Sequence, residues 1–189
     1  MNMTDEKIIE MLKNRLDEYR FNHSLAVADE AVVLAKRYGC DINKARTAGL
    51  LHDVFKNESV ENMIDYINKN NIKLTDVEMN AKKLWHSILG SYYISNDLGV
   101  DDIDVINAVR YHTTARAGMS ILEKVIYLAD YTSADRTYNG VEQMRKAVKI
   151  DMESAMQIAL EFSINELLQK GACIHPDTIN AYNEIMLRG

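Results

Sequence analysis

Proline and glycine, the residues that most often interrupt helices and strands, are scarce in this chain. One proline and eight glycines occur among 189 residues, which makes a sandwich or barrel with many tight turns hard to build. Long helices are favoured instead, and no segment shows the pattern of a strand. We therefore predict an all-α fold, a compact helical bundle, and at this length a single domain over residues 1–189.

Apolar residues recur at three- and four-residue spacing, as on the buried face of a helix. One such helix covers residues 22–38 and ends before Gly39, and Asp41 is placed to cap the next helix. Between residues 140 and 171 no breaker interrupts a long apolar stripe. The same signals predict further helix starts at Ser59, Thr75, Leu84, Asp101, Ser120 and Pro176.

The charge of the chain limits its partners. A net charge of −6 argues against a broad basic face for nucleic acid or anionic lipid, although it allows a local basic pocket. No apolar run approaches the roughly 18 residues of a membrane span, and the first residues are acidic, so we expect a cytoplasmic protein with no membrane partner. Cys40 and Cys173 stand alone, which predicts neither a disulfide framework nor a thiolate zinc site.

Histidine and aspartate are the residues best placed for chemistry. Four of the five histidines fall on four different predicted helices, and an aspartate ends an apolar stretch on another helix. Side chains from several helices of a bundle can converge on one point, and imidazole with carboxylate suits iron, manganese, zinc or magnesium. The alternative for each residue alone is a hydrogen-bonded position in the core. These residues are His23, His52, His86, His112 and Asp130.

The adjacent pair His52-Asp53 has a special geometry. Consecutive side chains lie about 100° apart around a helix, so the two residues can turn towards one ion only at a helix end. There Asp53 could also bridge to a second ion. A site of two histidines and two aspartates leaves coordination positions open, as in catalytic rather than structural sites. The metal would activate a water for attack on a phosphoryl group.

The order His23, His52-Asp53, Asp130 resembles that of the HD-domain metal phosphohydrolases, an all-α superfamily. Five segments are also similar to the motifs of one branch, the YqeK family of bacterial symmetrical diadenosine tetraphosphate hydrolases, and they place core motifs across residues 20–182. These enzymes split the dinucleotide in the middle to give two ADP. The segments are Arg20-Phe-Asn-His23, Leu51-His-Asp-Val-Phe-Lys56, Arg110-Tyr-His-Thr-Thr114, Tyr127-Leu-Ala-Asp-Tyr131 with Arg136, and Ile174-His-Pro-Asp-Thr178.

The resemblance implies a role for each matching residue. It implies one or two divalent ions, iron in preference to manganese, zinc or magnesium, and the implied ligands are His23, His52, Asp53 and Asp130. The implied catalytic residues are Asp53, His86 and His112, and either of these histidines could protonate the leaving oxygen. The implied substrate-binding residues are Arg20, Lys56, His86, His112, Thr113, Arg136 and His175.

Two segments depart from the pattern of this family. After His86 the chain reads Ser-Ile-Leu-Gly, where relatives often have a proline-containing turn. Before Arg136 it reads Thr-Ser-Ala-Asp, where a Glu-Pro pair is common. Ser133 therefore removes a carboxylate, which leaves the arrangement around Arg136 open.

We therefore expect a metal-dependent hydrolase that converts a dinucleoside polyphosphate, diadenosine tetraphosphate, into ADP. Alternatives are an HD phosphohydrolase for another nucleotide, such as a guanosine alarmone or a deoxynucleoside triphosphate, and a non-catalytic nucleotide-binding HD module. The module is disfavoured because every implied ligand position holds a competent residue. We expect no nucleic-acid partner, and the sequence leaves a homodimer open.

Overall fold

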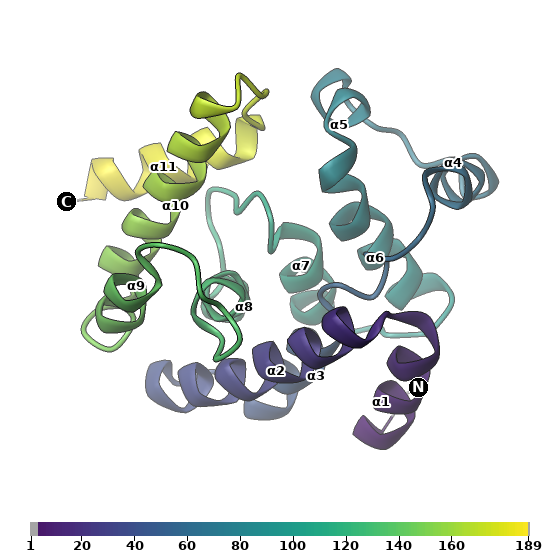
Figure 1. The fold of residues 1–189 in the computed structure, drawn as a ribbon, viewed down its shortest axis with the longest axis horizontal. Coiled ribbons are helices and arrows are strands. Elements are labelled where there is room, and N and C mark those ends of the chain that lie inside the picture. Colours follow the sequence, from purple (N-terminus) through teal and green to yellow (C-terminus); the bar gives the residue numbers. More distant parts are fainter. Residues whose placement is uncertain (1–3, 189) are drawn as a thin grey trace.

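The computed structural model describes residues 4–188, and within them it contains helices and connections but no strand (Figure 1). This confirms the all-α prediction. At the centre, α2 packs against α3 and α8, and α7 contacts α3, α6 and α8. The four central helices are α2 (Glu18–Tyr38), α3 (Ile42–Leu51), α7 (Ile103–Tyr111) and α8 (Ile121–Thr132).

The other helices flank this centre on two sides (Figure 1). On the right of the view lie α1 (Asp5–Arg15), α4 (Val60–Lys69), α5 (Asp76–Asn80) and α6 (Trp85–Asn96), the last preceded by the 3₁₀ turn η1 (Lys82–Leu84). On the left and at the top lie α9 (Val141–Ala147), α10 (Met152–Gln169) and α11 (Pro176–Arg188).

Local capping signals place four helix starts and one helix end where the sequence predicts them. The side chains of Asp41 and Ser59 accept hydrogen bonds from backbone N–H groups of the first turn, and Thr75 and Ser120 each form a capping box. Such caps are each worth about 1 kcal/mol. Gly39 ends α2 with a left-handed φ of 75°, which glycine adopts without steric cost.

Three predicted boundaries were wrong. The helix predicted over residues 22–38 begins earlier, at Glu18, because the Asp17 side chain caps it by accepting from the Arg20 N–H at 2.8 Å. The cap of α7 is Asp102 rather than Asp101, because the Asp102 side chain accepts from the N–H groups two and three residues on. The stripe over residues 140–171 is divided between α9 and α10, because Asp151 accepts from the Ser154 N–H at 2.7 Å and starts a new helix. An aspartate that bonds nearby backbone in this way competes with helix continuation.

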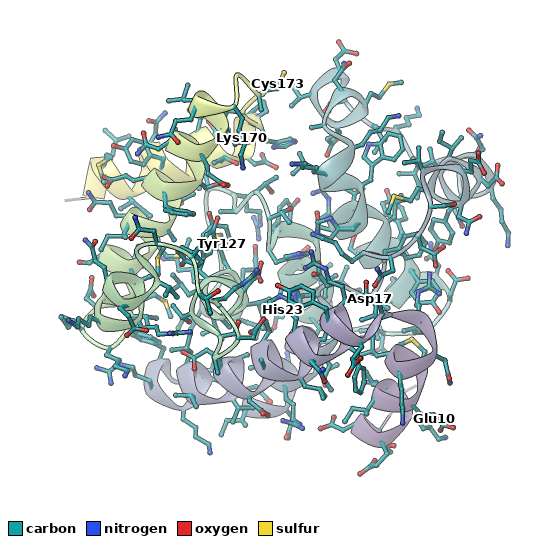
Figure 2. The ribbon with its side chains drawn as sticks, viewed as in Figure 1. Glu10, Asp17, His23, Tyr127, Lys170 and Cys173 are labelled. Atoms are coloured by element: carbon teal, nitrogen blue, oxygen red, sulfur yellow. The ribbon has the colours of Figure 1, made fainter. Side chains whose placement is uncertain are left out.

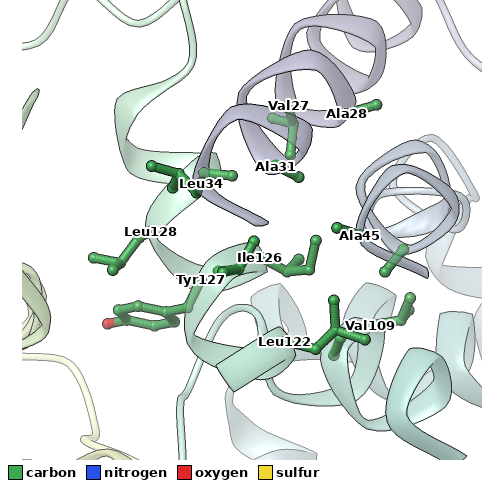
Figure 3. Close-up of a cluster of buried hydrophobic side chains, with 14 of the residues drawn as sticks. Val27, Ala28, Ala31, Leu34, Ala45, Val109, Leu122, Ile126, Tyr127 and Leu128 are labelled. Atoms are coloured by element: carbon green, nitrogen blue, oxygen red, sulfur yellow. The ribbon is translucent and has the colours of Figure 1, made fainter. Parts of the chain in front are cut away.

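Small residues let the central helices approach closely. Figure 3 shows Val27, Ala28 and Ala31 of α2 facing Ala45 of α3 across the core. At Gly49 of α3, an added Cβ would lie only 2.7 Å from the Ala28 Cα. The glycine is therefore required for this close packing of α2 on α3.

The structure bears on two further expectations. Cys40 is partly buried and Cys173 is exposed, and both are free thiols. Among residues 4–188, none of the helices combines the length and apolar character that a membrane span needs.

Candidate metal centre

Five helices deliver histidine and aspartate side chains to one region at the centre of the protein, where Figure 2 labels His23. The fold achieves this because helix ends meet there: one histidine lies in the second turn of α2, one in the first turn of α6, and two directly follow α3 and α7. These side chains are His23, His52, Asp53, His86, His112 and Asp130. All of their residues are buried except Asp130, which is half-buried.

The ligand atoms form two overlapping groups. His23, His52 and Asp130 make one, and His52, Asp53 and His112 make the other, with the ligand atoms of each group within 4.8 Å of one another. Asp53 Oδ1 also lies 3.1 Å from His86 Nε2. His52 is thus shared by the two groups, and Asp53 lies where it could bridge two ions, as the helix-end argument requires.

Three of the four histidines are oriented by backbone. His52, His86 and His112 each donate Nδ1–H to the carbonyl oxygen three residues earlier, at 2.7 Å. A carbonyl can only accept, so the proton is on Nδ1 and the Nε2 lone pair faces the cluster. This is the tautomer in which Nε2 can ligate a metal.

The unpartnered atoms of the cluster fit a cation. His52 Nε2 and Asp53 Oδ1 are buried and have no hydrogen-bond partner, a state that costs about 1–3 kcal/mol per group. His86 Nε2 and His112 Nε2 face each other at 3.2 Å. With a proton on each Nδ1, both Nε2 atoms present lone pairs, which repel each other unless a proton or a cation lies between them. These nitrogen and oxygen donors therefore fit a divalent ion.

The protonation states agree with this fit. Burial lowers the pKa of His52 to about 3 and the pKa of His86 to about 4. Burial alone would raise the pKa of both Asp53 and Asp130. The surrounding histidines outweigh burial at Asp53 and lower its pKa. At Asp130, the hydrogen bond from His23 and the charge of Arg136 outweigh burial and lower the pKa. At neutral pH His52 and His86 are therefore neutral and Asp53 and Asp130 charged, which are the forms that bind metal.

Three predicted cations surround the cluster. Arg20 Nη1 lies 3.0 Å from Asp53 Oδ2, and Lys56 Nζ lies 3.0 Å from His86 Nε2. Arg136 forms an ion pair with Asp130. The structure therefore brings all three predicted phosphate-binding cations to the edge of the ligand cluster.

A basic pocket opens beside His86. Its volume is about 410 Å³, within the usual range for small-molecule sites. Two exposed lysines of η1 line it, and our reading of the sequence missed them, since two adjacent lysines ordinarily form a solvated surface. The lining residues are Arg20, Lys56, Met63, Lys82, Lys83 and His86.

Two predicted substrate-binding residues are held by other partners. The Thr113 hydroxyl lies 2.9 Å from the Ser87 hydroxyl. His175 is buried with its Nε2 3.6 Å from Glu78 Oε1, the oxygen that also pairs with Arg110 at 2.5 Å. His175 thus belongs to a second buried charged group, between α5, α7 and the start of α11.

Sequence reasoning also missed Asp135. Its Oδ2 lies 2.7 Å from His23 Nδ1, although the two residues are 112 positions apart in the chain. The only signal was indirect, because Ser133 stands where a carboxylate was expected and another carboxylate follows two residues later.

Known proteins are similar to this chain over most of its length. The HD domain model matches residues 20–135. The chain is 37% identical over 185 residues to a symmetrical bis(5'-nucleosyl)-tetraphosphatase of Halalkalibacterium halodurans, covering 98% of each chain. It is 35% identical to the protein of that name in Bacillus subtilis, covering 96% of this chain and 97% of the relative.

A solved structure of a similar protein has the same fold. A crystal structure described as a predicted HD superfamily hydrolase involved in NAD metabolism from Clostridium acetobutylicum superposes with a TM-score of 0.95 at 38% identity, covering 100% of both chains. The chain therefore belongs to the HD-domain family, in the group of the symmetrical bis(5'-nucleosyl)-tetraphosphatases.

Proposed function

We propose that this protein is a metal-dependent phosphohydrolase that cleaves diadenosine tetraphosphate symmetrically into two ADP. The observation that carries the proposal is the cluster of imidazoles and carboxylates, with donor atoms at His52 and Asp53 that have no hydrogen-bond partner, next to a basic pocket. Relatives that match almost the whole chain are named for this activity.

The residues that would hold the metal follow from the two ligand groups. Iron is proposed because the resemblance to the YqeK family implies it. The implied ligands His23, His52, Asp53 and Asp130 supply nitrogen and oxygen donors, which also suit manganese, zinc or magnesium. Asp53 and His112 could contribute to a second ion. When bound, a divalent ion supplies two effects, a lowered pKa for a coordinated water and polarisation of the phosphoryl oxygen under attack.

The charges of the site suit a polyanion only when metal is present. Three carboxylates at the cluster, those of Asp53, Asp130 and Asp135, are paired with basic groups. Three permanent cations, Arg20, Lys56 and Arg136, balance them. A divalent ion therefore gives the site a net positive charge, which an otherwise acidic protein needs in order to bind a tetraphosphate.

The chain's own residues would position the phosphates and stabilise the charge that develops on them. Arg20 and Lys56 face both the pocket and Asp53, so they can hold a phosphate next to the reacting one. Lys56 donates to His86 Nε2 at 3.0 Å, and this pair is placed to stabilise or protonate the leaving oxygen of ADP. Such fixed charges account for most of the catalysis in phosphoryl transfer.

The test is a product analysis. The protein is purified with iron under reducing conditions, incubated with diadenosine tetraphosphate, and the nucleotides are separated by anion-exchange chromatography. ADP as the sole product is expected. ATP with AMP would contradict symmetrical cleavage, and no turnover with iron, manganese, zinc or magnesium would contradict the enzyme assignment. Parallel assays with a guanosine alarmone and a deoxynucleoside triphosphate separate the alternative substrates.

Reversing the charge of the pocket lysines is expected to weaken substrate binding. In the double variant Lys82→Glu/Lys83→Glu, KM should rise about tenfold, equivalent to about 1.4 kcal/mol, while kcat changes little. The reason is that the side chains of these lysines line the pocket, whereas the contact of Lys83 with the ligand cluster is made by its backbone carbonyl, which the substitution keeps. Initial rates over a range of substrate concentrations measure both constants.

The matched control is Lys7→Glu/Lys13→Glu, which makes the same change in net charge at exposed positions of α1. Its KM should stay close to that of the wild type at physiological salt, because screening removes interactions beyond about 8 Å. An equal rise in KM for both double variants would show that overall charge, rather than the pocket, controls binding.

A further inference from the structure

His23 differs from the other three histidines of the cluster in what orients its ring. His52 and His112 directly follow the last residue of a helix, where backbone carbonyls lack helical partners and can accept from Nδ1. His23 lies inside α2, whose carbonyls are used by the helix itself. Its Nδ1 is instead 2.7 Å from Asp135 Oδ2, in the turn after α8.

The Asp135 carboxylate is fixed on both sides. Its Oδ1 accepts a hydrogen bond from the Ser133 hydroxyl at 2.7 Å, and Ser133 is fully buried. Its Oδ2 accepts from His23, because a charged carboxylate can only accept. His23 Nδ1 therefore carries a proton. Its Nε2 lies 3.0 Å from Asp130 Oδ1, on the side of the ring that faces the ligand cluster.

We propose that Asp135 is a positioning residue of the metal centre, which holds the ring of His23 so that Nε2 faces the ligand cluster. A carboxylate on the outer nitrogen of a ligating imidazole fixes the ring and makes the other nitrogen a stronger donor. This inference rests on the metal centre of the proposed function. It assigns Asp135 a role that the sequence motifs do not give it.

Ser133 lies where a carboxylate could substitute for that of Asp135. The Ser133 side chain contacts the Asp135 carboxylate directly, so a longer acidic side chain at residue 133 would reach towards the space that this carboxylate occupies. Either residue can therefore present an oxygen to His23 Nδ1, provided that the other one does not block it. The double variant Ser133→Glu/Asp135→Ala makes this exchange experimentally.

The experiment measures metal affinity and the protonation of His23 Nδ1 separately. Chelator competition gives the dissociation constant for Fe²⁺ or Mn²⁺ in the wild type and in Asp135→Asn, which is expected to bind about 10–100-fold more weakly. Nitrogen-15 NMR of the metal-free protein reports whether His23 Nδ1 carries a proton. We expect a protonated Nδ1 in the wild type and reduced protonation of Nδ1 in Asp135→Ala. Asp97→Asn, whose carboxylate accepts from the Tyr66 hydroxyl, is the matched control and should change neither reading.

Each outcome decides the inference. An unchanged dissociation constant in Asp135→Asn, or unchanged protonation of His23 Nδ1 in Asp135→Ala, would overturn the positioning role. Recovery of most of the lost affinity in Ser133→Glu/Asp135→Ala supports the exchange of carboxylates, whereas no recovery rejects it. If the wild type binds metal and carries a proton on His23 Nδ1 but does not hydrolyse diadenosine tetraphosphate, the proposed function fails while the role of Asp135 stands.

Discussion

Replacing His52 with alanine is expected to abolish metal binding and phosphohydrolase activity together. The Nε2 atom of His52 belongs to both ligand groups and has no hydrogen-bond partner. Its loss therefore removes a donor from both groups at once. A metal ion contributes several kcal/mol to transition-state stabilisation, and the rate should therefore fall by about a thousandfold or more. Metal analysis of the purified variant and initial rates with diadenosine tetraphosphate provide the two measurements.

Because His52 is completely buried, a second variant separates chemistry from packing. Asp53→Asn keeps the size of the side chain and removes only its charge, and the same joint loss is expected. Asp29→Asn, at an exposed ion pair on α2, is the control and should retain both properties. A His52→Ala protein that keeps its full metal content and rate would contradict this metal centre. A non-catalytic module would show no wild-type rate to lose.

Replacing Gly49 with alanine is expected to destabilise the fold by about 1–3 kcal/mol, the usual cost of forcing extra volume into a packed core. The added Cβ would lie 2.7 Å from the Ala28 Cα and 3.1 Å from the Ala28 N. Both are backbone atoms of α2, so no side chain can move aside and the helices must separate. Urea unfolding followed by circular dichroism measures the change in the free energy of unfolding.

Gly90→Ala is the matched control, since Gly90 is also a glycine inside a helix. Its added Cβ would meet side-chain atoms of Val54 and Val109 at 3.5 Å and 3.6 Å, which are ordinary contact distances. Alanine is favoured over glycine in helices by up to about 1 kcal/mol, so this variant should be neutral or slightly more stable. Equal destabilisation by the two substitutions would show that close helix packing is not what Gly49 provides.

The Gly49 variant should also weaken metal binding. Gly49 lies three residues before His52, and Ala28 lies five residues after His23. The two imidazoles, whose ring centroids are 5.2 Å apart, therefore depend on the spacing of α2 and α3. Separation of these helices would move one ligand away from the other.

Sequence reasoning works best on features set by neighbouring residues. The caps at Asp41, Ser59, Thr75 and Ser120 were predictable because each bonds to backbone within three residues along the chain. The candidate ligands were also found, since histidine and aspartate on several apolar helix faces need partners. The division between α9 and α10 was missed, because a continuous apolar stripe outweighed the weaker capping signal of Asp151.

By itself, the sequence determined that the chain is helical, where several helices begin, and which residue types carry the chemistry. The tertiary structure alone decided the crossing of α2 over α3 at Gly49, the basic pocket with Lys82 and Lys83, and the contact of Asp135 with His23. The physical reason is distance along the chain. Helix starts depend on hydrogen bonds between near neighbours, whereas the His23–Asp135 hydrogen bond spans 112 positions and exists only once the helices have packed.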